Sequence, residues 1–527
     1  MLVALPILIP LLTAALCLLG GQRARLQRGL ALLGAGGLLV AASVLFARVW
    51  IDGPLALHVG GWSAPLGITL VADVFAALMV LVAALLHVLV SIYAFADVDS
   101  RRVRHGYFAF TNVMLMGVSG AFLTGDLFNL YVWFEVMLMS SFVLLVLGGG
   151  RAQMEAGIKY VALSLLSSAL FLAGIGVIYG IAHTLNMAHL SAQLAVAAAS
   201  HPWLVTSAAL LLLLAFGIKA AVVPLHFWLP DSYPAPPPAV TALFAALLTK
   251  TGVYALVRVF TLVLPPSDYL FQLLAVVAGL TMLVGVLGAV AQAQVRRILS
   301  VHIVSQIGYM VLGVALLGAA DAAVRHLAIA AAIFYIIHNM LVKTNLLLLS
   351  GTIRSLTGTE QLSRLGGLLN RAPLVAVLFL VSAFSLAGLP PSSGFWAKLG
   401  IIQAGFSARA YLLTGTALFV GLLTLLSMVK IWSEVFWKAE PAPPPGVPAE
   451  PQPATMTTPS RRRGLYRLGP SVALVVVSVA IGLYPQPLLA MARRAAEQLL
   501  DRLAYVAAVG IPTDGWAPPA ADLEPEP

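Results

Sequence analysis

The chain has 527 residues, of which 61% are hydrophobic and only 9% are charged, and its formal net charge is +10. Soluble domains seldom exceed about half apolar residues, and apolar runs of roughly 20 residues, long enough to cross a bilayer, recur here from end to end. These values exclude a soluble globular protein and predict an all-α polytopic membrane protein. The basic residues fall in short clusters between apolar runs, which is how membrane proteins set their orientation and which argues against nucleic-acid binding.

Fourteen apolar segments are predicted to cross the membrane. They are residues 2–19, 29–50, 68–96, 107–124, 126–147, 158–181, 202–223, 239–262, 268–290, 299–319, 326–350, 373–403, 411–437 and 468–490. We expect helices throughout, because a lipid-facing backbone must satisfy its hydrogen bonds within its own segment. The first segment is expected to be a retained span and not a signal peptide, because its basic cluster follows the apolar run instead of preceding it.

Basic residues gather in the loops that follow odd-numbered segments. These loops hold Arg23, Arg25, Arg28, Arg101, Arg102, Arg104, Arg151, Lys159, Arg296, Arg297, Arg354, Arg364, Arg371, Lys438, Arg461, Arg462, Arg463 and Arg467. The even-numbered loops hold little beyond Arg325 and Arg409. By the positive-inside rule, the odd-numbered loops are predicted to face the cytoplasm, and both termini are predicted to lie outside it.

Proline interrupts two of the segments. The seventh has Lys219 shortly before Pro224 and leads to a proline-rich stretch at 234–238, whereas the twelfth has Pro391 shortly before Lys398. Proline removes a backbone donor and clashes with the preceding turn, so both helices are predicted to break. Discontinuous helices at matching places of two halves are typical of inverted-repeat transporters. We therefore predict two inverted five-helix repeats, spans 4–8 and 9–13, in which helices 7 and 12 are broken.

This division gives five parts. They are a three-helix segment at 1–106, a first repeat at 107–262, a second repeat at 268–437, a proline-rich cytoplasmic linker at 438–467, and a terminal part at 468–527. The terminal part is expected to contain the last span and an amphipathic helix at 488–509 that lies on the membrane or on a partner. Its acidic, proline-rich end is predicted to be disordered.

Ionisable residues inside apolar segments are costly, by about 3 kcal/mol or more. Glu135, Lys219, Lys250 and Lys398 occupy such positions, and the default interpretation is a path for protons or ions. Lys219 is the expected partner of Glu135, because a buried lysine can hold and release a proton where an arginine cannot. The alternative for Glu135 is a static ion pair that pins two helices together. Lys250, at the middle of its segment, is expected in a hydrated cavity.

The second half adds Lys343, His302 and His338 to Lys398 as candidates for the same path. Lone histidines on apolar helices are more often hydrogen-bonded core residues than relays, and both interpretations stay open for His302 and His338. His226 and Asp231 follow the first break and are candidates for the cytoplasmic mouth of the path. His87 and Arg258 are weaker candidates near the ends of their segments.

No pattern points to a cofactor or a metal. Cys17 is the single cysteine, which excludes an internal disulfide and an iron–sulfur cluster. The run 148–150 lacks the lysine that a phosphate-binding loop requires. We therefore predict no catalytic residue, no cofactor and no metal site.

Several of these motifs, in this order, resemble one superfamily. They are Glu135 in its aromatic run, Lys219 before Pro-Leu-His-Phe-Trp-Leu-Pro at 224–230, Lys250, Ser-Gln-Ile-Gly-Tyr at 305–309, and 390–398. The superfamily comprises the antiporter-like subunits of respiratory complex I and of Mrp-type cation/proton antiporters, and the resemblance is greatest to the D subunits of the latter. It covers the third to the thirteenth segment. The proline-rich stretch at 234–238 is denser than the family pattern, and the linker and acidic tail have no counterpart in it.

The resemblance implies a fourteen-helix fold with two inverted repeats, in the plasma membrane of a bacterium. It also implies a complex with other membrane subunits that exchanges Na⁺ or K⁺ for H⁺, in which Glu135, Lys219, Lys250 and Lys398 carry the proton. A secondary transporter subunit, not an enzyme, is therefore the leading hypothesis. The alternatives are a proton-pumping subunit of complex I or of a membrane-bound hydrogenase, and a structural subunit with inert buried charges.

Overall fold

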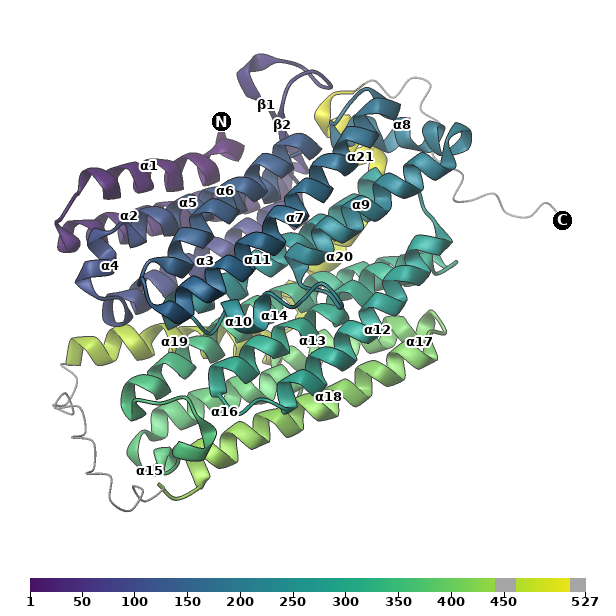
Figure 1. Ribbon diagram of the computed structural model, residues 1–527. Helices are drawn as coiled ribbons and strands as arrows, with labels where there is room; N and C mark the ends of the chain where they lie inside the picture. The colour runs from purple at the N-terminus through teal and green to yellow at the C-terminus, as the bar shows by residue number, and fades with distance from the viewer. Residues whose placement is uncertain (441–460, 512–527) are drawn as a thin grey trace.

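The structure, a computed structural model, describes residues 1–440 and 461–511 as a bundle of long helices that run alongside one another (Figure 1). The helices are α1 (Leu5–Leu19), α2 (Ala24–Asp52), α3 (Val74–Asp97), α4 (Ser100–Arg104), α5 (Tyr107–Leu123), α6 (Leu127–Val146), α7 (Arg151–Ala182), α8 (Met187–Ser200), α9 (Pro202–Ala220), α10 (Leu229–Ser232), α11 (Pro238–Arg258), α12 (Asp268–Val290), α13 (Val295–Ala315), α14 (Ala322–Thr357), α15 (Leu368–Arg371), α16 (Pro373–Ala387), α17 (Ser393–Ser407), α18 (Tyr411–Trp432), α19 (Arg461–Leu483), α20 (Gln486–Leu500) and α21 (Arg502–Val509). The predicted helical membrane fold is confirmed.

Each of the fourteen predicted segments overlaps at least one helix. Among the described residues, 12 helices are long and apolar enough to cross a membrane. The fourth and twelfth predicted segments correspond to shorter helices, because α5 has 17 residues and the twelfth segment is divided into α16 and α17, with 15 residues each. Fourteen crossings and the division into two repeats remain predictions.

The third predicted segment is helical only in part. Its first residues form strand β2 (Thr69–Ala72), which pairs antiparallel with β1 (Leu55–His58) in a hairpin. Helix α3 starts only at Val74, because the Asp73 carboxylate accepts a hydrogen bond from the Ala76 amide at 2.8 Å and caps the first turn. The expectation of a helix from residue 68 is therefore wrong for residues 68–73.

The C-terminal part differs from the prediction in two respects. Helix α19 begins at Arg461, so residues 461–467 are helical and do not belong to the linker. The predicted amphipathic helix is divided into α20 and α21, and the buried residues of α20 pack against α14 and α3 of this chain. The rest of the predicted linker and the acidic tail lie outside the described residues.

Three central helices carry much of the buried charge. The most apolar stretches of α11 and α13 are fully buried, and that of α14 is nearly so. Helix α14 packs against α3, α11, α13, α16, α17, α19 and α20, which places it at the centre of the bundle (Figure 1). Lys250, His302 and Lys343 lie on these helices, which are shielded from lipid by the helices around them.

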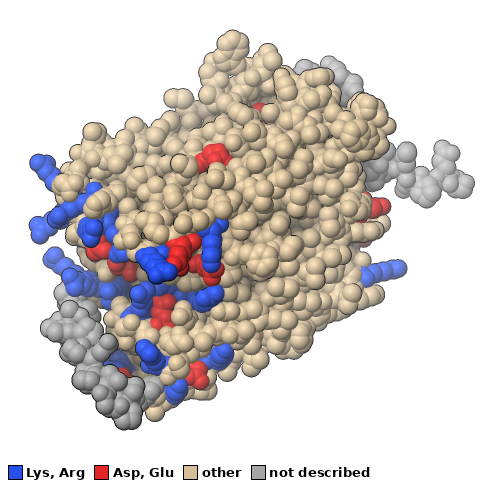
Figure 2. Space-filling view, in the orientation of Figure 1, with Lys and Arg blue, Asp and Glu red and all other residues tan. Residues whose placement is uncertain are grey.

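The charged surface is gathered at one end of the bundle, which we call the basic end (Figure 2). Two cavities and a set of ion pairs bring together Arg102, Lys159, Arg297, Arg354 and Arg364 at this end. The hairpin of β1 and β2 precedes α3 at the opposite end, because α3 runs from Val74 to Asp97 at the basic end.

Candidate functional site: a row of buried charges

All four lysines singled out in the membrane segments are buried, with side chains on four different helices. Lys250 and Lys343 have no exposed surface, and Lys219 and Lys398 are 6% and 7% exposed. The helices that carry them pack in sequence, α9 against α11, α11 against α14, and α14 against α17. The lysines therefore form a row through the interior of the bundle, with Glu135, half-buried on α6, beside its first member.

Lys219 lies at the first break. Helix α9 ends one residue later, at Ala220, and Ala221 adopts a left-handed conformation with φ +63°. The last turn of a helix leaves carbonyl groups unpaired and carries the negative end of the dipole, which favours a cation there. Among the described residues, the Lys219 Nζ has no hydrogen-bond partner. The predicted break is confirmed, although only the four-residue α10 follows it.

A glycine lets α11 approach this helix end closely. A Cβ added at Gly252 would lie 2.6 Å from the backbone nitrogen of Ala220, so any larger residue would push α9 and α11 apart. The close approach fixes the position of the Lys219 backbone relative to the helix that carries Lys250.

Glu135 is held by a hydroxyl group. Its Oε1 accepts a short hydrogen bond from the Ser168 Oγ of α7. Because the Lys219 Nζ has no hydrogen-bond partner among the described residues, the expected contact between Glu135 and Lys219 is not formed in this structure. The carboxylate is nevertheless the charge that acts on the ammonium of Lys219 from nearby. Pairing of the two remains a prediction.

Lys250 and Lys343 are held by backbone carbonyl groups. The Lys250 Nζ donates to the Ala245 carbonyl at 2.8 Å, and the Lys343 Nζ donates to the Leu299 carbonyl of α13 at 3.1 Å. No ion pair within 4.0 Å reaches either ammonium among the described residues. A buried charge without an ionic partner is costly, which favours the neutral amine.

Lys398 lies at the second break and points back towards it. Its Nζ donates to the carbonyl of Ala387, the last residue of α16, at 2.6 Å, and lies 5.6 Å from the centre of the Tyr309 ring. Gly388 follows Ala387 with φ +93°, a conformation that ends the helix. The ammonium thus combines the negative end of a helix with an aromatic face.

Both candidate histidines have hydroxyl partners. The His302 Nε2 lies 2.8 Å from the Ser427 Oγ, and the His338 Nδ1 lies 2.8 Å from the Ser393 Oγ at the start of α17. Ser393 also contacts Ser478 of α19 at 2.9 Å. Both histidines are therefore buried and hydrogen-bonded through one ring nitrogen, whereas the His302 Nδ1 has no hydrogen-bond partner among the described residues. The same hydroxyl contacts would serve a relay.

Polar side chains of α13 and α14 extend the row of buried polar groups. The sequence gives little indication of these contacts. The Tyr335 hydroxyl donates to Gln306 through a short hydrogen bond, and the Tyr309 and Tyr335 rings stack with centres 5.1 Å apart. The Tyr309 hydroxyl donates to the Ala417 carbonyl at 2.5 Å. Only the resemblance of 305–309 to a family motif points to this region.

The two residues expected at the mouth of the path lie apart from the lysines. Asp231 of α10 accepts hydrogen bonds from Lys159 of α7 at 2.6 Å and from Arg297 of α13 at 3.0 Å. It therefore ties the first predicted repeat to the second at the basic end. Burial lowers the pKa of the His226 imidazole, in the turn before α10, below its ordinary value, so the neutral form is favoured.

Arg258, a weaker candidate, belongs to a buried ion pair at the other end of α11. Its Nη1 and Nη2 lie 2.5 and 2.9 Å from the two carboxylate oxygens of Asp73. Both side chains are almost fully buried, and removal of one partner from such a pair costs about 3–5 kcal/mol. No sequence pattern points to Asp73, which precedes Arg258 by 185 residues. His87, the other weak candidate, is also buried.

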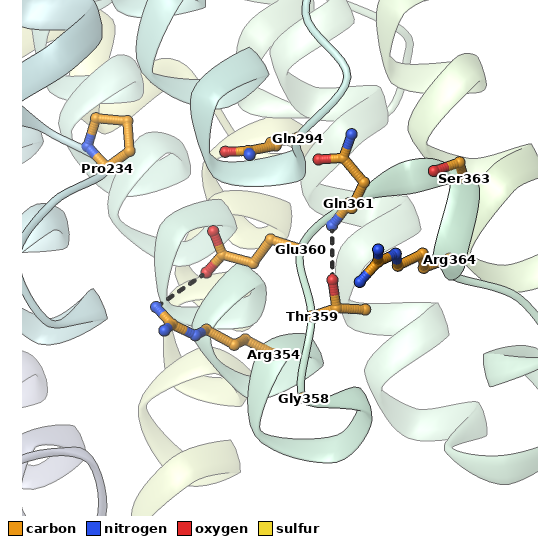
Figure 3. A pocket seen from close by; sticks show the side chains of 9 residues that line it. All are labelled: Pro234, Gln294, Arg354, Gly358, Thr359, Glu360, Gln361, Ser363 and Arg364. Carbon is orange, nitrogen blue, oxygen red and sulfur yellow. Dashed lines mark hydrogen bonds and ion pairs between the residues drawn. The ribbon is translucent and has the colours of Figure 1, made fainter. Parts of the chain in front are cut away.

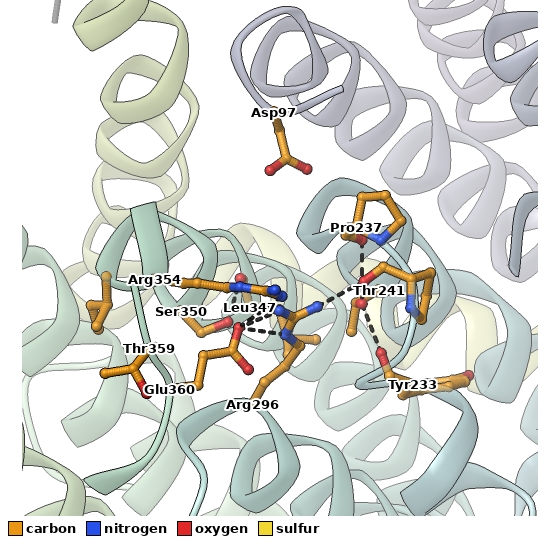
Figure 4. A network of polar contacts seen from close by, with 12 residues as sticks. Asp97, Tyr233, Pro237, Thr241, Arg296, Leu347, Ser350, Arg354, Thr359 and Glu360 are labelled. Carbon is orange, nitrogen blue, oxygen red and sulfur yellow. Dashed lines mark hydrogen bonds and ion pairs between the residues drawn. The ribbon is translucent and has the colours of Figure 1, made fainter. Parts of the chain in front are cut away.

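A cavity of about 620 Å³ opens at the basic end (Figure 3). Glu360 lies at its edge, 3.8 Å from Arg354. The fully buried Arg296 donates to Glu360 (Figure 4). It also donates to the Pro236 carbonyl at 2.7 Å. The sequence indicates only a loop charge at Arg296, whereas in the structure this residue anchors the proline-rich stretch to α13.

No metal centre is indicated in the part of the chain that the structure describes. Across residues 1–440 and 461–511, no group of three or more His, Cys, Asp and Glu side chains is placed to hold a metal ion.

Comparison with known proteins gives consistent results. Residues 124–424 match the family described as NADH:quinone oxidoreductase/Mrp antiporter, TM. The chain is 41% identical over 513 residues to the D subunit of the Na⁺/H⁺ antiporter of Alkalihalophilus pseudofirmus, covering 96% of this chain and 99% of that protein. It is 40% identical to the D subunit of the Na⁺/H⁺ antiporter of Bacillus subtilis, with the same coverage of both chains.

Solved structures agree. A chain of the Mrp complex from Dietzia sp. DQ12-45-1b has a TM-score of 0.87 and 37% identity, with 96% of this chain and 99% of that chain covered. A chain of respiratory complex I from Thermus thermophilus has a TM-score of 0.77 at 24% identity, with 95% and 100% covered, and shares the fold. The resemblance inferred from the motifs is thus confirmed, and the chain belongs to the NADH:quinone oxidoreductase/Mrp antiporter family.

Proposed function

We propose that this chain is the proton-translocating membrane subunit of a multisubunit Na⁺(K⁺)/H⁺ antiporter. Relatives at 40% and 41% identity over nearly the whole chain are named as D subunits of Na⁺/H⁺ antiporters. The chain acts as part of a secondary transporter and not as an enzyme. It resides in the plasma membrane of a bacterium, with the basic end in the cytoplasm and both termini outside, as the positive-inside rule favours.

One observation carries the proton path: four buried lysines follow one another across packed helices without an ionic partner among the described residues. We assign the path to Glu135, Lys219, Lys250, Lys343 and Lys398, with His302 and His338 as secondary members. His226 and Asp231 lie nearer the basic end and would act at its mouth.

The row moves charge because neighbouring ammonium groups repel one another. Protonation of one lysine raises the cost of protonating the next, so a proton arriving at one end favours release at the other. Glu135 sets the first step, because it favours the charged form of Lys219 when the two pair and disfavours it when they separate. Carbonyl contacts at Lys250, Lys343 and Lys398 accept a hydrogen bond from either the ammonium or the amine.

The complex supplies what this chain lacks. We assign the exported cation, Na⁺ or K⁺, to a route in another membrane subunit, since no acidic cluster typical of a sodium site is apparent in the sequence. The likeness to the Mrp complex of Dietzia supports such partners. The runner-up, a proton-pumping subunit of complex I or a hydrogenase, has weaker support, because the identity to the complex I chain is only 24%.

Exchange in everted vesicles that contain the whole complex tests the proposal. Lys219→Ala and Glu135→Ala should each lower cation-driven proton movement roughly 100-fold, because each removes a proton-carrying or proton-controlling group. Lys438→Ala removes a half-exposed lysine that pairs with Glu434 at the basic end, and should exchange as the parent does. Unchanged exchange by Lys219→Ala in an assembled complex would contradict the proposed path. Copurification with iron–sulfur subunits would favour the redox pump.

A further inference from the structure

A second cavity at the basic end lies against the helix that carries Lys250. Its volume is about 470 Å³, and its lining includes Asp97, Arg102, Gln153, Arg354 and residues 236–238. Asp97 is the last residue of α3, and residues 236–238 lead directly into α11. A water-sized molecule can therefore reach both the Asp97 carboxylate and the first turn of α11 from the same space.

Asp97 differs from the other acidic residues at this end. Asp231 is bound by Lys159 and Arg297, and Glu360 is bound by Arg296. Among the described residues, Asp97 forms no ion pair within 4.0 Å, and its Oδ2 accepts one hydrogen bond, from the Ala239 amide at 3.0 Å. Asp97 lines the cavity, and its carboxylate has acceptor positions beyond the one that binds the Ala239 amide.

The distance from Asp97 to Lys250 is short when followed along α11. The Lys250 Nζ turns back to the Ala245 carbonyl, six residues after the Ala239 amide that binds Asp97. Six residues span about 9 Å along the axis, since an α-helix rises about 1.5 Å per residue.

Polar groups occupy the interval. Thr241 lies between the two positions, and its hydroxyl donates to the Tyr233 carbonyl at 2.7 Å. The Tyr233 hydroxyl donates to the carbonyl of Phe244, next to Ala245, at 3.1 Å. Figure 4 shows Asp97, Pro237, Thr241 and Tyr233 around the same stretch of chain. Both hydroxyl groups donate to backbone carbonyls, so a proton route beside α11 would use the acceptor positions of these hydroxyl oxygens together with bridging water molecules.

We propose that Asp97 is the group through which protons pass between the cytoplasm and Lys250. This inference rests on the function proposed above. During cation export, a proton leaves the Lys250 ammonium, passes the hydroxyl groups beside α11, protonates the Asp97 carboxylate and departs into the cavity water. Lys250, left as a neutral amine, then receives the next proton from within the row, and the charge on Asp97 is restored.

The surroundings of Asp97 act on its proton in two opposite senses. Burial of the carboxyl favours the protonated acid. The charges around it are basic, since Arg102 of α4 and Arg354 of α14 line the cavity, and Arg296 of α13 and Arg467 of α19 act on it from nearby. This charge favours the carboxylate, so Asp97 can accept a proton and return it to water after each transfer.

The test uses exchange by the whole complex in everted vesicles, where the medium faces the basic end. Asp97→Asn keeps an oxygen that accepts the Ala239 hydrogen bond but cannot carry a proton. We expect its maximal exchange rate to fall roughly tenfold or more, with an unchanged half-saturating cation concentration and normal assembly. Asp97→Glu should recover most of the rate, because the carboxylate is restored. A purely structural role predicts the opposite pattern, with Asp97→Asn active and the longer Asp97→Glu impaired.

Asp99→Asn is the matched control. Asp99 lies two residues after Asp97 and carries the same charge, but its side chain is exposed and pairs with Arg102. The Asp99→Asn variant should exchange as the parent does. Parental exchange by Asp97→Asn, beside inactive Lys219→Ala, overturns the role of Asp97 alone, whereas active Lys219→Ala overturns the proposed function itself. If Asp97→Asn fails to assemble, Asp97→Ser, which also keeps an acceptor oxygen, takes its place with the same two outcomes.

Discussion

The two broken helices hold their lysines in different ways. At the first break, Lys219 precedes the end of α9, and its ammonium has no hydrogen-bond partner among the described residues. At the second, Lys398 follows the break and binds the Ala387 carbonyl at the end of α16 while it lies over the Tyr309 ring. The first ammonium is thus free to change partners, and the second is held at a fixed place.

The chain around the first break has less regular structure than the chain around the second. The first is followed by turns and the short α10, whereas the second joins two helices of 15 residues each. Helix α19 supports the second break, since the Trp396 Nε1 donates to the Gly482 carbonyl at 2.8 Å. A helix break can thus leave a lysine ammonium able to change partners, as at Lys219, or hold it in one position, as at Lys398. We therefore expect substitutions at the first break to have the larger effects.

The largest effect is expected for Lys219→Arg. A guanidinium keeps its proton throughout the physiological range, so a position that must release a proton cannot use it. Exchange in everted vesicles should fall roughly 100-fold in a complex that still assembles. A variant that retains more than half of the parental rate would show that Lys219 acts only as a fixed positive charge.

Two glycine substitutions compare a close helix contact at the first break with an open position beside Lys398. Gly252→Ala places a Cβ 2.6 Å from the Ala220 nitrogen, which should cost about 1–3 kcal/mol of stability and lower exchange several-fold. Gly421→Ala, beside the second break, brings its Cβ only to 3.6 Å from the Lys398 Nζ, an ordinary contact. Thermal unfolding and exchange of the purified complexes would check the pair. Equal losses of stability and exchange in the two variants would show that the close approach of α9 and α11 at Gly252 has no special role.

The smallest effect is expected at the aromatic face of the second break. Tyr309→Leu removes the ring from Lys398 and the hydrogen bond to Ala417, and should weaken the hold on the ammonium by about 1–2 kcal/mol. Tyr309→Phe keeps the ring and serves as the control. We expect a several-fold slower exchange for leucine than for phenylalanine, measured at saturating cation. Equal rates would show that the aromatic face contributes nothing to holding Lys398.

Local patterns are sufficient to predict the helices and the breaks. Apolar length predicts the long helices, but not the short helices α4, α8, α10 and α15 or the start of α19. It also fails at the start of α3, where the Asp73 cap and the pairing of β2 with β1 prevail over hydropathy. The prolines near Lys219 and Lys398 predict both interruptions, because a proline in a helix interior removes a backbone hydrogen bond and clashes with the preceding turn. The apolar face of α20 is visible in the sequence, whereas its partner, α14 of this chain, is not.

Partners distant in sequence cannot be predicted in this way. Asp73 and Arg258 are 185 residues apart, and Arg296 and Glu360 are 64 apart, so no local pattern joins them. Glu135 and Lys219 illustrate the opposite case, in which the sequence favours a pair and the structure holds the carboxylate on Ser168. Asp97 has the sequence context of an ordinary span-end residue, and only the cavity beside α11 distinguishes it.

The amino-acid sequence alone indicates which segments are apolar enough to cross a membrane, where the helices break and which ionisable residues lie inside apolar segments. Each of these depends on the free energy of placing a residue in hydrocarbon or in a helix, which is a property of short segments. Which charges pair, which lysine has no hydrogen-bond partner among the described residues and where a cavity meets Asp97 are set by the tertiary structure. Those outcomes depend on how helices distant in sequence pack together. The contacts at Gly252 and around Asp97 form only in the packed bundle.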